Sequence, residues 1–274
     1  MSDNLLTSAE MTAYWRSQDP KLSGDSLSSL LVSKEGIQLA NNFKEQAYPL
    51  IEHHLALRNR FFFTRASRLL KSGRYDACIS IGSGLSLLNH YLADAIPDII
   101  FYDMDLPEVL QMRNERLLKI KDRFKTTTWE RVRSQLIDLE RSFVEKKSLK
   151  KLLPHCSSPL LVIEGVVFYL SQGCFAWLFS EFSKYKTGAL LFDYWPVDES
   201  RQSSTTKKML DFLAVSIRER VKMFHHRSEI QKLAAPKKVE EDLTIQEVES
   251  EFVKKPLLLD IDQIVPCRYA VIVK

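Results

Sequence analysis

Three short segments carry residue types that can bind or position a ligand, and each begins with an apolar run. They read ISIGSG (residues 79–84), FYDMD (101–105) and LLVIEG (160–165). Glycines let a ligand approach the backbone at the start of a helix, and carboxylates accept hydrogen bonds from hydroxyl and ammonium groups. These segments predict a site for a ligand related to a nucleotide.

Two carboxylates, Asp103 and Asp105, lie about 20 residues after the glycines, the spacing at which an acid accepts both hydroxyls of a ribose. An Asp here can instead cap the following helix, although the spacing favours ribose for at least one of the two. Both positions share one face of a strand, so periodicity does not choose between them. Glycines plus an acid fit both NAD and S-adenosylmethionine. Leu87 occupies the third glycine position of GxGxxG, which weakens the dinucleotide interpretation.

Glu164 begins the run EGVVFYL (residues 164–170), directly after a buried strand. A Glu is a poor core residue unless it has a partner, because a buried carboxylate is costly, and here it would suit a cationic ammonium group. Exposure of Glu164 in a loop explains the position equally well. Tyr169 adds a hydroxyl and a ring nearby.

Strands and helices alternate along the chain. Strands are expected at 76–81, 99–105, 160–163 and 189–193, with a further one inside 126–137, and amphipathic helices at 34–71, 85–94 and 108–123 and around Phe175–Phe182. This alternation predicts a doubly wound, Rossmann-like α/β fold with a mostly parallel sheet.

We expect one domain over residues 1–274. Within it, residues 1–72 form a helical cap, 73–197 the cofactor-binding core, and 198–250 a helical lid or insertion without a strand. The segment 251–274 contains two strand candidates, 257–261 and 268–273, expected as an antiparallel pair at one sheet edge.

The composition is that of an ordinary globular protein, with 45% hydrophobic and 27% charged residues and a net charge of +4 from 39 basic and 35 acidic residues. Because the basic residues are spread out, we do not expect nucleic acid as a partner. The first residues do not resemble a signal peptide, and no apolar run reaches the roughly 18 residues of a membrane span. We therefore expect a cytoplasmic protein without a membrane partner; the oligomeric state is not predicted.

The four cysteines, at positions 78, 156, 174 and 267, form no CxxC or Cys/His pair. We expect buried free thiols and no metal site.

Five segments, in order and at similar spacing, resemble the leucine carboxyl methyltransferase family of class I S-adenosylmethionine-dependent O-methyltransferases, including its bacterial small-molecule relatives. They are ALRNRFFF (56–63), ISIGSG (79–84), FYDMDLPEVL (101–110), IDLE (137–140) and IEGVVFYL (163–170). The resemblance covers roughly residues 45–195, and the LPEV and EGxxxYL runs are more distinctive than the glycines.

The resemblance implies S-adenosyl-L-methionine as cofactor and a role for each matching residue. Arg58 pairs with the methionine carboxylate, with Arg60 as the alternative if the register slips by two. Glu164 accepts from the ammonium group, and Tyr169 lies near the transferring methyl as the catalytic residue.

For the nucleoside part, the resemblance implies that Gly82, Ser83 and Gly84 line the methionine and ribose portion. Asp105 takes the ribose hydroxyls, and Asp138 with the backbone of Leu139 flanks the adenine. One departure stands out: the family has an Asp-Thr-Arg-like stretch after the glycines, where this chain has Leu85-Ser86-Leu87.

The expected reaction transfers a methyl group to a carboxylate or hydroxyl oxygen of a small molecule or of a protein C-terminus. A carboxylate is already ionised at neutral pH, whereas a hydroxyl needs a general base. His225 and His226 are candidates for that base, but two exposed histidines on a helix are the commoner explanation, so neither is assigned as catalytic. A tRNA-modifying methyltransferase, a catalytically silent S-adenosylmethionine-binding module and a NAD-dependent oxidoreductase are the competing functions.

Overall fold

The computed structural model describes residues 2–153, 156–218, 221–235 and 237–274. A seven-stranded sheet runs through its centre, in the order β3-β2-β1-β4-β5-β7-β6. Its strands are β1 (Ala77–Ile81), β2 (Ile100–Asp105), β3 (Val132–Leu136), β4 (Pro159–Ile163), β5 (Ala189–Tyr194), β6 (Lys238–Thr244) and β7 (Arg268–Val273). The first five strands are parallel, and β7 pairs antiparallel with both β5 and β6. The expected mostly parallel Rossmann-like sheet is confirmed.

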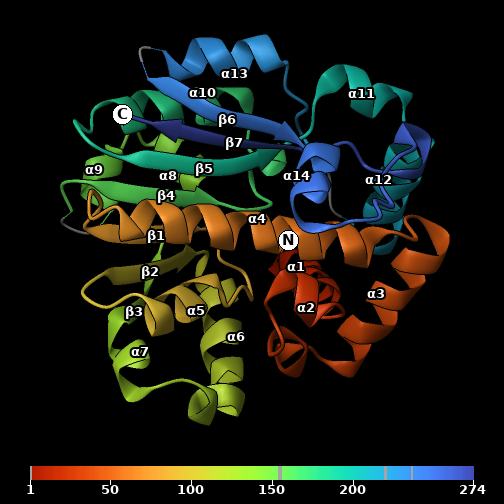
Figure 1. Cartoon of the computed structure of the whole chain (residues 1–274), viewed down its shortest axis with the longest axis horizontal. Helices are drawn as coiled ribbons and strands as arrows, with labels where there is room; N and C mark the ends of the chain where they lie inside the picture. Colours follow the sequence, from red (N-terminus) through yellow and green to blue (C-terminus); the bar gives the residue numbers. More distant parts are fainter. Residues whose placement is uncertain (1, 154–155, 219–220, 236) are drawn as a thin grey trace.

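Helices cover both faces of the sheet (Figure 1). The helices are α1 (Ser2–Arg16), α2 (Pro20–Ser23), α3 (Lys34–Gln46), α4 (Ile51–Lys71), α5 (Leu88–Ala95), α6 (Pro107–Leu117), α7 (Thr126–Arg131), α8 (Leu139–Val144), α9 (Leu149–Leu152), α10 (Gln172–Ser183), α11 (Val197–Gln202), α12 (Ser204–Ser216), α13 (Arg227–Ala234) and α14 (Ile245–Phe252). The described residues also contain four short 3-10 helices, Ser28–Leu31, Leu118–Arg123, Val167–Tyr169 and Ile261–Gln263.

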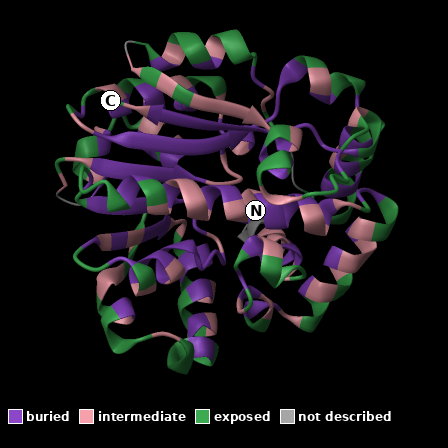
Figure 2. Ribbon diagram, in the orientation of Figure 1, coloured by how far each residue is buried: buried purple, intermediate pink, exposed green. Residues whose placement is uncertain are grey.

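The strand residues alternate between two apolar layers. Leu160 and Val162 of β4 belong to the layer shared with α4 and α5, and Leu161 and Ile163 belong to the layer shared with α10. All five β4 residues are buried, as expected for a parallel strand covered on both sides. Figure 2 shows this continuous buried band through the sheet. The strand register therefore fixes which side chains face each helical layer.

The helices α1, α2 and α3 form the expected N-terminal helical cap (Figure 1). The helix α1 contacts both α3 and α4, and α2 contacts α4, whose 21 residues also pack against β4. In α1, Met11 and Ala13 are almost fully buried, and Trp15 donates its indole N–H to the carbonyl of Ala40 in α3 at 3.2 Å. The N-terminal segment is thereby fixed over one end of the sheet.

One strand lies where the sequence predicted only helices. The strand β6, within the expected lid or insertion 198–250, was missed because it is rich in charge, as edge strands commonly are. Its Glu240 and Glu241 pair with Arg68 and Arg65 of α4, and Asp242 pairs with Arg268 of β7. The charged residues that form these ion pairs stand in β6 where strand prediction expects alternating apolar residues.

The predicted strand at 257–261 is wrong. Leu257 and Leu259 are 55% and 73% exposed, and only Leu258 between them is buried. The backbone N–H groups of Leu257 and Leu258 donate to the buried carboxylate of Glu249 at 2.8 and 3.0 Å, so they are not in a sheet ladder. The antiparallel partner of β7 at the edge is therefore β6.

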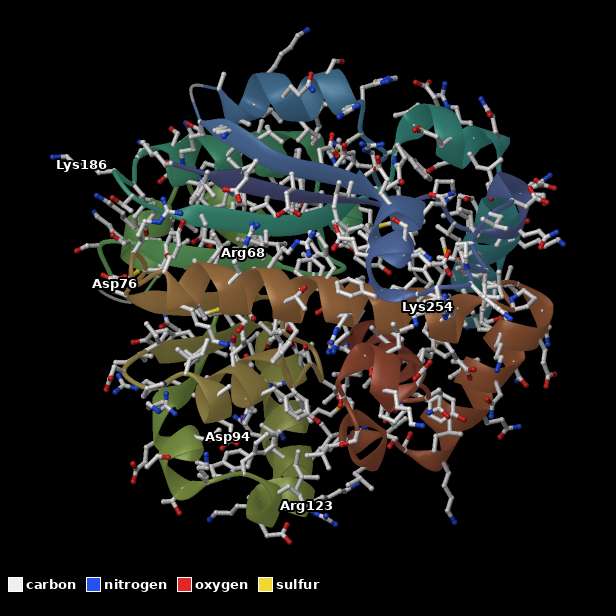
Figure 3. All side chains as sticks on the ribbon, viewed as in Figure 1. Arg68, Asp76, Asp94, Arg123, Lys186 and Lys254 are labelled. Carbon is white, nitrogen blue, oxygen red and sulfur yellow. The ribbon has the colours of Figure 1, made fainter. Side chains whose placement is uncertain are left out.

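Other features of the described chain bear on the sequence expectations. Cys78, Cys174 and Cys267 are buried free thiols, as expected, whereas Cys156 is only partly buried. The labelled basic side chains Arg123, Lys186 and Lys254 project from well-separated parts of the surface (Figure 3). No helix in the described residues has the length and hydropathy that a membrane span requires.

Candidate active site

A cavity of about 630 Å³ lies at the carboxyl ends of the five parallel strands, with α1 and α12 contributing to its wall. The chain order reverses between β1 and β4, and such switch points are where ligands bind in open α/β sheets. The cavity is lined by every residue that the sequence predicted for the site: Arg58, Gly82, Ser83, Gly84, Asp105, Asp138, Leu139, Glu164 and Tyr169. The alternative Arg60 does not line it; its guanidinium lies 5.7 Å from the centre of the Phe252 ring.

The loop after β1 is held close to its neighbours. The N–H groups of Gly82 and Ser83 both donate to the carbonyl of Met104, at 2.8 and 3.2 Å. Gly82 has a φ of +71°, and a Cβ there would overlap the Cγ2 of Val166 in the loop after β4. Only glycine combines this backbone angle with this approach, so Gly82 brings the β1 and β4 loops together at the cavity.

The structure separates the two carboxylates that the sequence could not distinguish. Asp105 lines the cavity, and its Oδ2 and Oδ1 accept from the N–H groups of Gly84 and Leu106, at 2.7 and 2.8 Å. Asp103 does not line the cavity and accepts from Arg113 at 2.5 Å and from Asn89 at 2.8 Å. Each Asp105 oxygen keeps a second lone pair for a hydroxyl group.

The pKa of Asp105 is raised, because burial outweighs the two N–H groups that donate to it. A hydrogen bond from a ligand hydroxyl would help to replace the lost water around this carboxylate.

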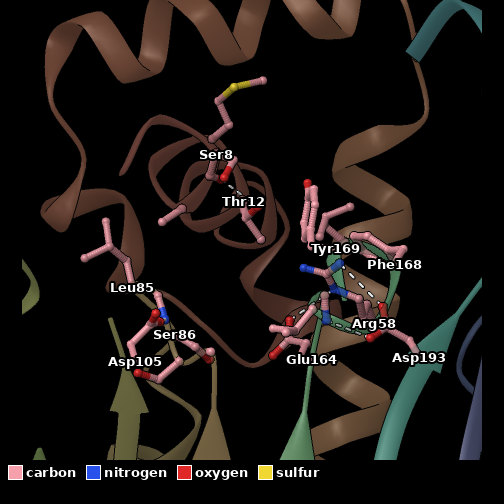
Figure 4. Close-up of a pocket in the computed structure, with 18 of the residues that line it drawn as sticks. Ser8, Thr12, Arg58, Leu85, Ser86, Asp105, Glu164, Phe168, Tyr169 and Asp193 are labelled. Atoms are coloured by element: carbon pink, nitrogen blue, oxygen red, sulfur yellow. Dashed lines mark hydrogen bonds and ion pairs between the residues drawn. The ribbon is translucent and has the colours of Figure 1, made fainter. Parts of the chain in front are cut away.

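On the opposite side of the cavity, two carboxylates and two guanidiniums meet, and Figure 4 shows three of these residues, Arg58, Glu164 and Asp193. The Nε of Arg58 donates to Oε1 of Glu164 at 3.1 Å, and Nη1 of Arg58 lies 3.6 Å from Oδ2 of Asp193. The Nη1 of Arg16, on α1, lies 3.7 Å from the same Glu164 oxygen. We call these four residues the charged cluster.

Burial and mutual attraction shift the pKa values of three residues of the charged cluster, Arg16, Arg58 and Asp193. Burial lowers the pKa of Arg16, whereas in Arg58 the same effect is outweighed by Glu164 and Asp193, and its pKa is raised. Burial also raises the pKa of Asp193 to about 6, against the opposing influence of Arg58. The cluster thus presents both signs of charge in a region with little water, an arrangement that suits a zwitterionic ligand.

Two buried polar atoms in residues that line the cavity make no hydrogen bond within the described part of the chain: Nη1 of Arg16 and Oγ of Ser83. Buried polar atoms nearly always have a partner, so these two indicate a polar ligand. S-adenosylmethionine offers a carboxylate for the guanidiniums, an ammonium group for Glu164 and hydroxyls for Asp105. The residues present therefore fit this cofactor.

Asp138 and Leu139 begin the helix α8 at the cavity wall. The Oδ1 of Asp138 accepts from the backbone N–H of Arg141 at 2.9 Å, and Asp138 is thereby the N-cap of α8. The Leu139 side chain is buried and, with Ile137, contributes an apolar wall. A planar base could lie against these residues.

Tyr169 ends the 3-10 helix Val167–Tyr169 and lies beside the charged cluster (Figure 4). Its ring contacts Phe168 edge-on, with ring centres 4.9 Å apart.

The two leucines of the stretch Leu85-Ser86-Leu87 pack against apolar residues. Leu85 and Leu87 are fully buried and pack in one cluster with Ala13 and Leu31 of the cap. The departure from the family pattern therefore joins the glycine loop to the N-terminal helices through apolar contacts.

Sequence reasoning missed Arg16 and Asp193. Arg16 lies in a polar segment that matches no motif, and only its position on α1 over the cavity reveals it. Asp193 ends a strand that was predicted, and its place at a carboxyl end was the available signal.

The two histidines considered as bases are placed elsewhere. Neither lines the cavity, and neither lies within a helix: His226 is exposed just before α13. The expectation of exposure is wrong for His225, which is fully buried against the ring of Phe175 at 4.2 Å.

Comparison with known proteins agrees with this geometry. Residues 5–183 match the model of the leucine carboxyl methyltransferase family. No curated protein sequence matches the chain. Among solved structures, a DUF574 family protein from Streptomyces avermitilis is similar over 97% of both chains, with 11% identity and a TM-score of 0.65. Magnesium protoporphyrin IX methyltransferase from Synechocystis, solved with bound SAH, is similar over 88% of this chain and 95% of its own, with 10% identity and a TM-score of 0.51.

The sheet order, the helices on both faces and the cavity at the switch point define a class I methyltransferase fold. The chain belongs to the leucine carboxyl methyltransferase family, and its cofactor is S-adenosylmethionine.

Proposed function

We propose that this protein transfers a methyl group from S-adenosylmethionine to an oxygen atom, and that the preferred acceptor oxygen is a carboxylate. The observation that carries the proposal is the charged cluster in the same cavity as Asp105 and the glycine loop. One cavity can thereby bind a zwitterionic amino-acid end on one side and a ribose on the opposite side.

Each residue of the cavity has a role in this proposal. Arg58 and Arg16 hold the methionine carboxylate, and Glu164 holds the ammonium group. Asp105 accepts from the ribose hydroxyls through the lone pairs that Gly84 and Leu106 leave available. Asp138 and the backbone of Leu139 flank the adenine, and Gly82, Ser83 and Gly84 let the cofactor approach the backbone.

When bound, the cofactor supplies an electrophilic methyl group on a positively charged sulfur. Tyr169, beside the charged cluster, positions the acceptor at that methyl. Holding the two reactants in line and excluding water account for most of the acceleration in such a transfer.

The state of the nearby titratable groups favours a carboxylate acceptor. Both ring nitrogens of His54 are engaged, with the hydroxyls of Tyr48 at 2.9 Å and Tyr269 at 3.1 Å, and burial lowers its pKa to about 3. The Oδ1 of Asp193 accepts from the N–H of Gly165 at 2.7 Å, and its Oδ2 faces Arg58. A hydroxyl acceptor would need a base, and both of these groups are already engaged, whereas a carboxylate acceptor needs no base.

Calorimetric titration with S-adenosylhomocysteine and with NAD tests the cofactor site. We expect binding of the first and none of the second, and loss of binding in Arg58→Ala and in Glu164→Ala. Arg60→Ala, on the same helix but outside the cavity, is the matched control and should bind normally. Unchanged affinity in both Arg58→Ala and Glu164→Ala would reject the assigned site.

The chemistry of the product tests the acceptor oxygen. Cell extract is incubated with methyl-labelled cofactor and the enzyme, and the product is then treated with mild alkali. Methyl esters release labelled methanol, whereas methyl ethers and N-methyl groups do not. Alkali-stable label in the product would contradict carboxyl methylation while leaving the cofactor site intact.

A further inference from the structure

We infer that the acceptor is a small monocarboxylic acid with an apolar body, and that this body is held in an apolar part of the cavity beside Tyr169. This inference rests on the proposed function and names its substrate class. The apolar part, here called the apolar chamber, is formed by Met11, Trp15, Phe43, Trp195, Met209 and Leu213.

The walls of the apolar chamber come from four separate parts of the chain. Met11 and Trp15 lie on α1, Phe43 on α3, Trp195 just after β5, and Met209 and Leu213 on α12. Each of these side chains is at most 8% exposed, although each lines the cavity. Apolar side chains that line a cavity and are otherwise packed in the core give it an apolar wall, as in small-molecule sites.

The apolar chamber adjoins the proposed place of methyl transfer. Phe168 contacts the ring of Tyr169 at 4.9 Å and stacks on Trp195 at 4.3 Å with an interplanar angle of 16°. On α4, Leu55 and Arg58 are three residues apart and therefore share one face of the helix, and both line the cavity. An acceptor body in the chamber can thus present a polar end to the charged cluster and Tyr169.

Several polar groups next to the apolar chamber are already paired. The indole N–H of Trp15 donates to Ala40, and Tyr48, His54 and Tyr269 bond to one another in a buried chain. A peptide chain entering here would leave its own amide groups buried without partners, at a cost of about 1–3 kcal/mol each. The chamber therefore favours a small molecule without a peptide backbone over a protein C-terminus.

The change in charge during methyl transfer also favours an acid as the acceptor. A carboxylate oxygen gives an electron pair to the methyl carbon, the S–C bond breaks, and its electron pair returns to sulfur. The products are a neutral ester and a neutral thioether, and no proton has to be removed. Because opposite charges disappear along this path, an environment of low dielectric constant favours the transfer.

A homologous series of acids tests the inference directly. Methyl transfer from labelled cofactor is measured with straight-chain acids from acetate to dodecanoate, with benzoate and naphthoate, and with a peptide that ends in a free leucine carboxylate. We expect kcat/KM to rise roughly fourfold per methylene while the chamber fills, the factor given by burial of one CH₂, and then to fall. The peptide should be a poor acceptor.

Two variants of α12 test whether the dependence of kcat/KM on chain length arises from the apolar chamber. Leu213→Trp fills it and should lower kcat/KM at least tenfold for the longest good acceptor while sparing acetate. Val215→Trp, on the same helix and at a position 80% exposed, should match the wild type. Binding of S-adenosylhomocysteine should be unchanged in both variants, which also shows that each is folded.

The outcomes separate this inference from the proposed function. Failure of the wild type to bind S-adenosylhomocysteine would reject the proposed function itself. If the cofactor product binds but kcat/KM is independent of chain length, or the peptide is the best acceptor, or no acid is methylated, the inference is wrong. If Leu213→Trp is unstable, the chain-length dependence of the wild type still decides.

Discussion

Arg113 and Asp103 form an ion pair at 2.5 Å in which both side chains are at most 2% exposed. The same guanidinium donates through Nη1 to the carbonyl of Gly84 at 3.0 Å. Asp103 in turn accepts from Asn89. This pair lies beneath the glycine loop and connects β2 to it, which explains why the chain has two acids on one strand with only Asp105 in the cavity.

Removing one member of this pair should destabilise the protein strongly. In Asp103→Asn, the Arg113 charge stays buried without its counter-ion, so we expect the free energy of unfolding to fall by about 3–5 kcal/mol. The double variant Asp103→Leu/Arg113→Met has no charge at these two positions and should recover part of that loss. Urea unfolding of both variants measures the difference. A double variant less stable than Asp103→Asn would contradict the argument.

Gly82→Ala should be more damaging than Gly73→Ala. Both glycines have a φ of +71°, so both substitutions carry the backbone strain of a left-handed residue, about 1–2 kcal/mol. At Gly73 nothing lies within 4 Å of the added Cβ, whereas at Gly82 it would overlap Val166. We expect an additional loss of about 1–3 kcal/mol in Gly82→Ala, with weaker binding of S-adenosylhomocysteine.

A second substitution isolates the steric part of this loss. Gly82→Ala/Val166→Ala removes the overlapping Cγ2 and should recover much of the difference from Gly73→Ala, measured by thermal unfolding. Equal stability of Gly82→Ala and Gly73→Ala would show that the contact with Val166 does not matter.

The sequence predicted the parts of the site that follow directly from strand ends. Gly82, Asp105 and Glu164 each follow an apolar run, and parallel strands bring their carboxyl ends to one edge. Arg16 could not be found in this way. It reaches the cavity because α1 packs on α3 and α4, and long-range packing of this kind has no local signal in the sequence.

The choice between Asp103 and Asp105 shows a second limit of prediction from the sequence. Both have the residue type and the strand face that ribose binding needs, and their surroundings alone separate them. Asp103 is neutralised by Arg113, ten residues later on α6, and Asp105 has only backbone donors. Likewise, β6 was not predicted because the partners of its charged residues, Arg65 and Arg68, lie far away in the sequence, on α4.

Asp193 should make the stability of the ligand-free protein depend on pH. Its folded-state pKa of about 6 lies above the value of about 3.9 in an unfolded chain, because burial disfavours the charged form. The folded state thus binds this proton more tightly, and the free energy of unfolding should fall as pH rises from about 4 to about 6. The difference of about two pH units corresponds to about 3 kcal/mol.

Asp193→Asn removes this titration and keeps an oxygen that can accept from Gly165. We expect the stability of the wild type to decline relative to the variant between about pH 4 and pH 6, as measured by urea unfolding at several pH values. Parallel pH profiles for the two proteins would mean that Asp193 titrates normally in the folded state.

Tyr169→Phe should separate acceptor positioning from cofactor binding. The substitution keeps the ring that contacts Phe168 and removes only the hydroxyl. Because small errors in the alignment of two reactants can cost a factor of about 100 in rate, we expect kcat to fall roughly 10- to 100-fold. The affinity for S-adenosylhomocysteine should stay the same, since its carboxylate and ammonium group are held by Arg58 and Glu164. Tyr185→Phe, buried outside the cavity, is the matched control and should leave kcat unchanged. A normal kcat in Tyr169→Phe, or a parallel loss of S-adenosylhomocysteine binding, would contradict the proposed role of this hydroxyl.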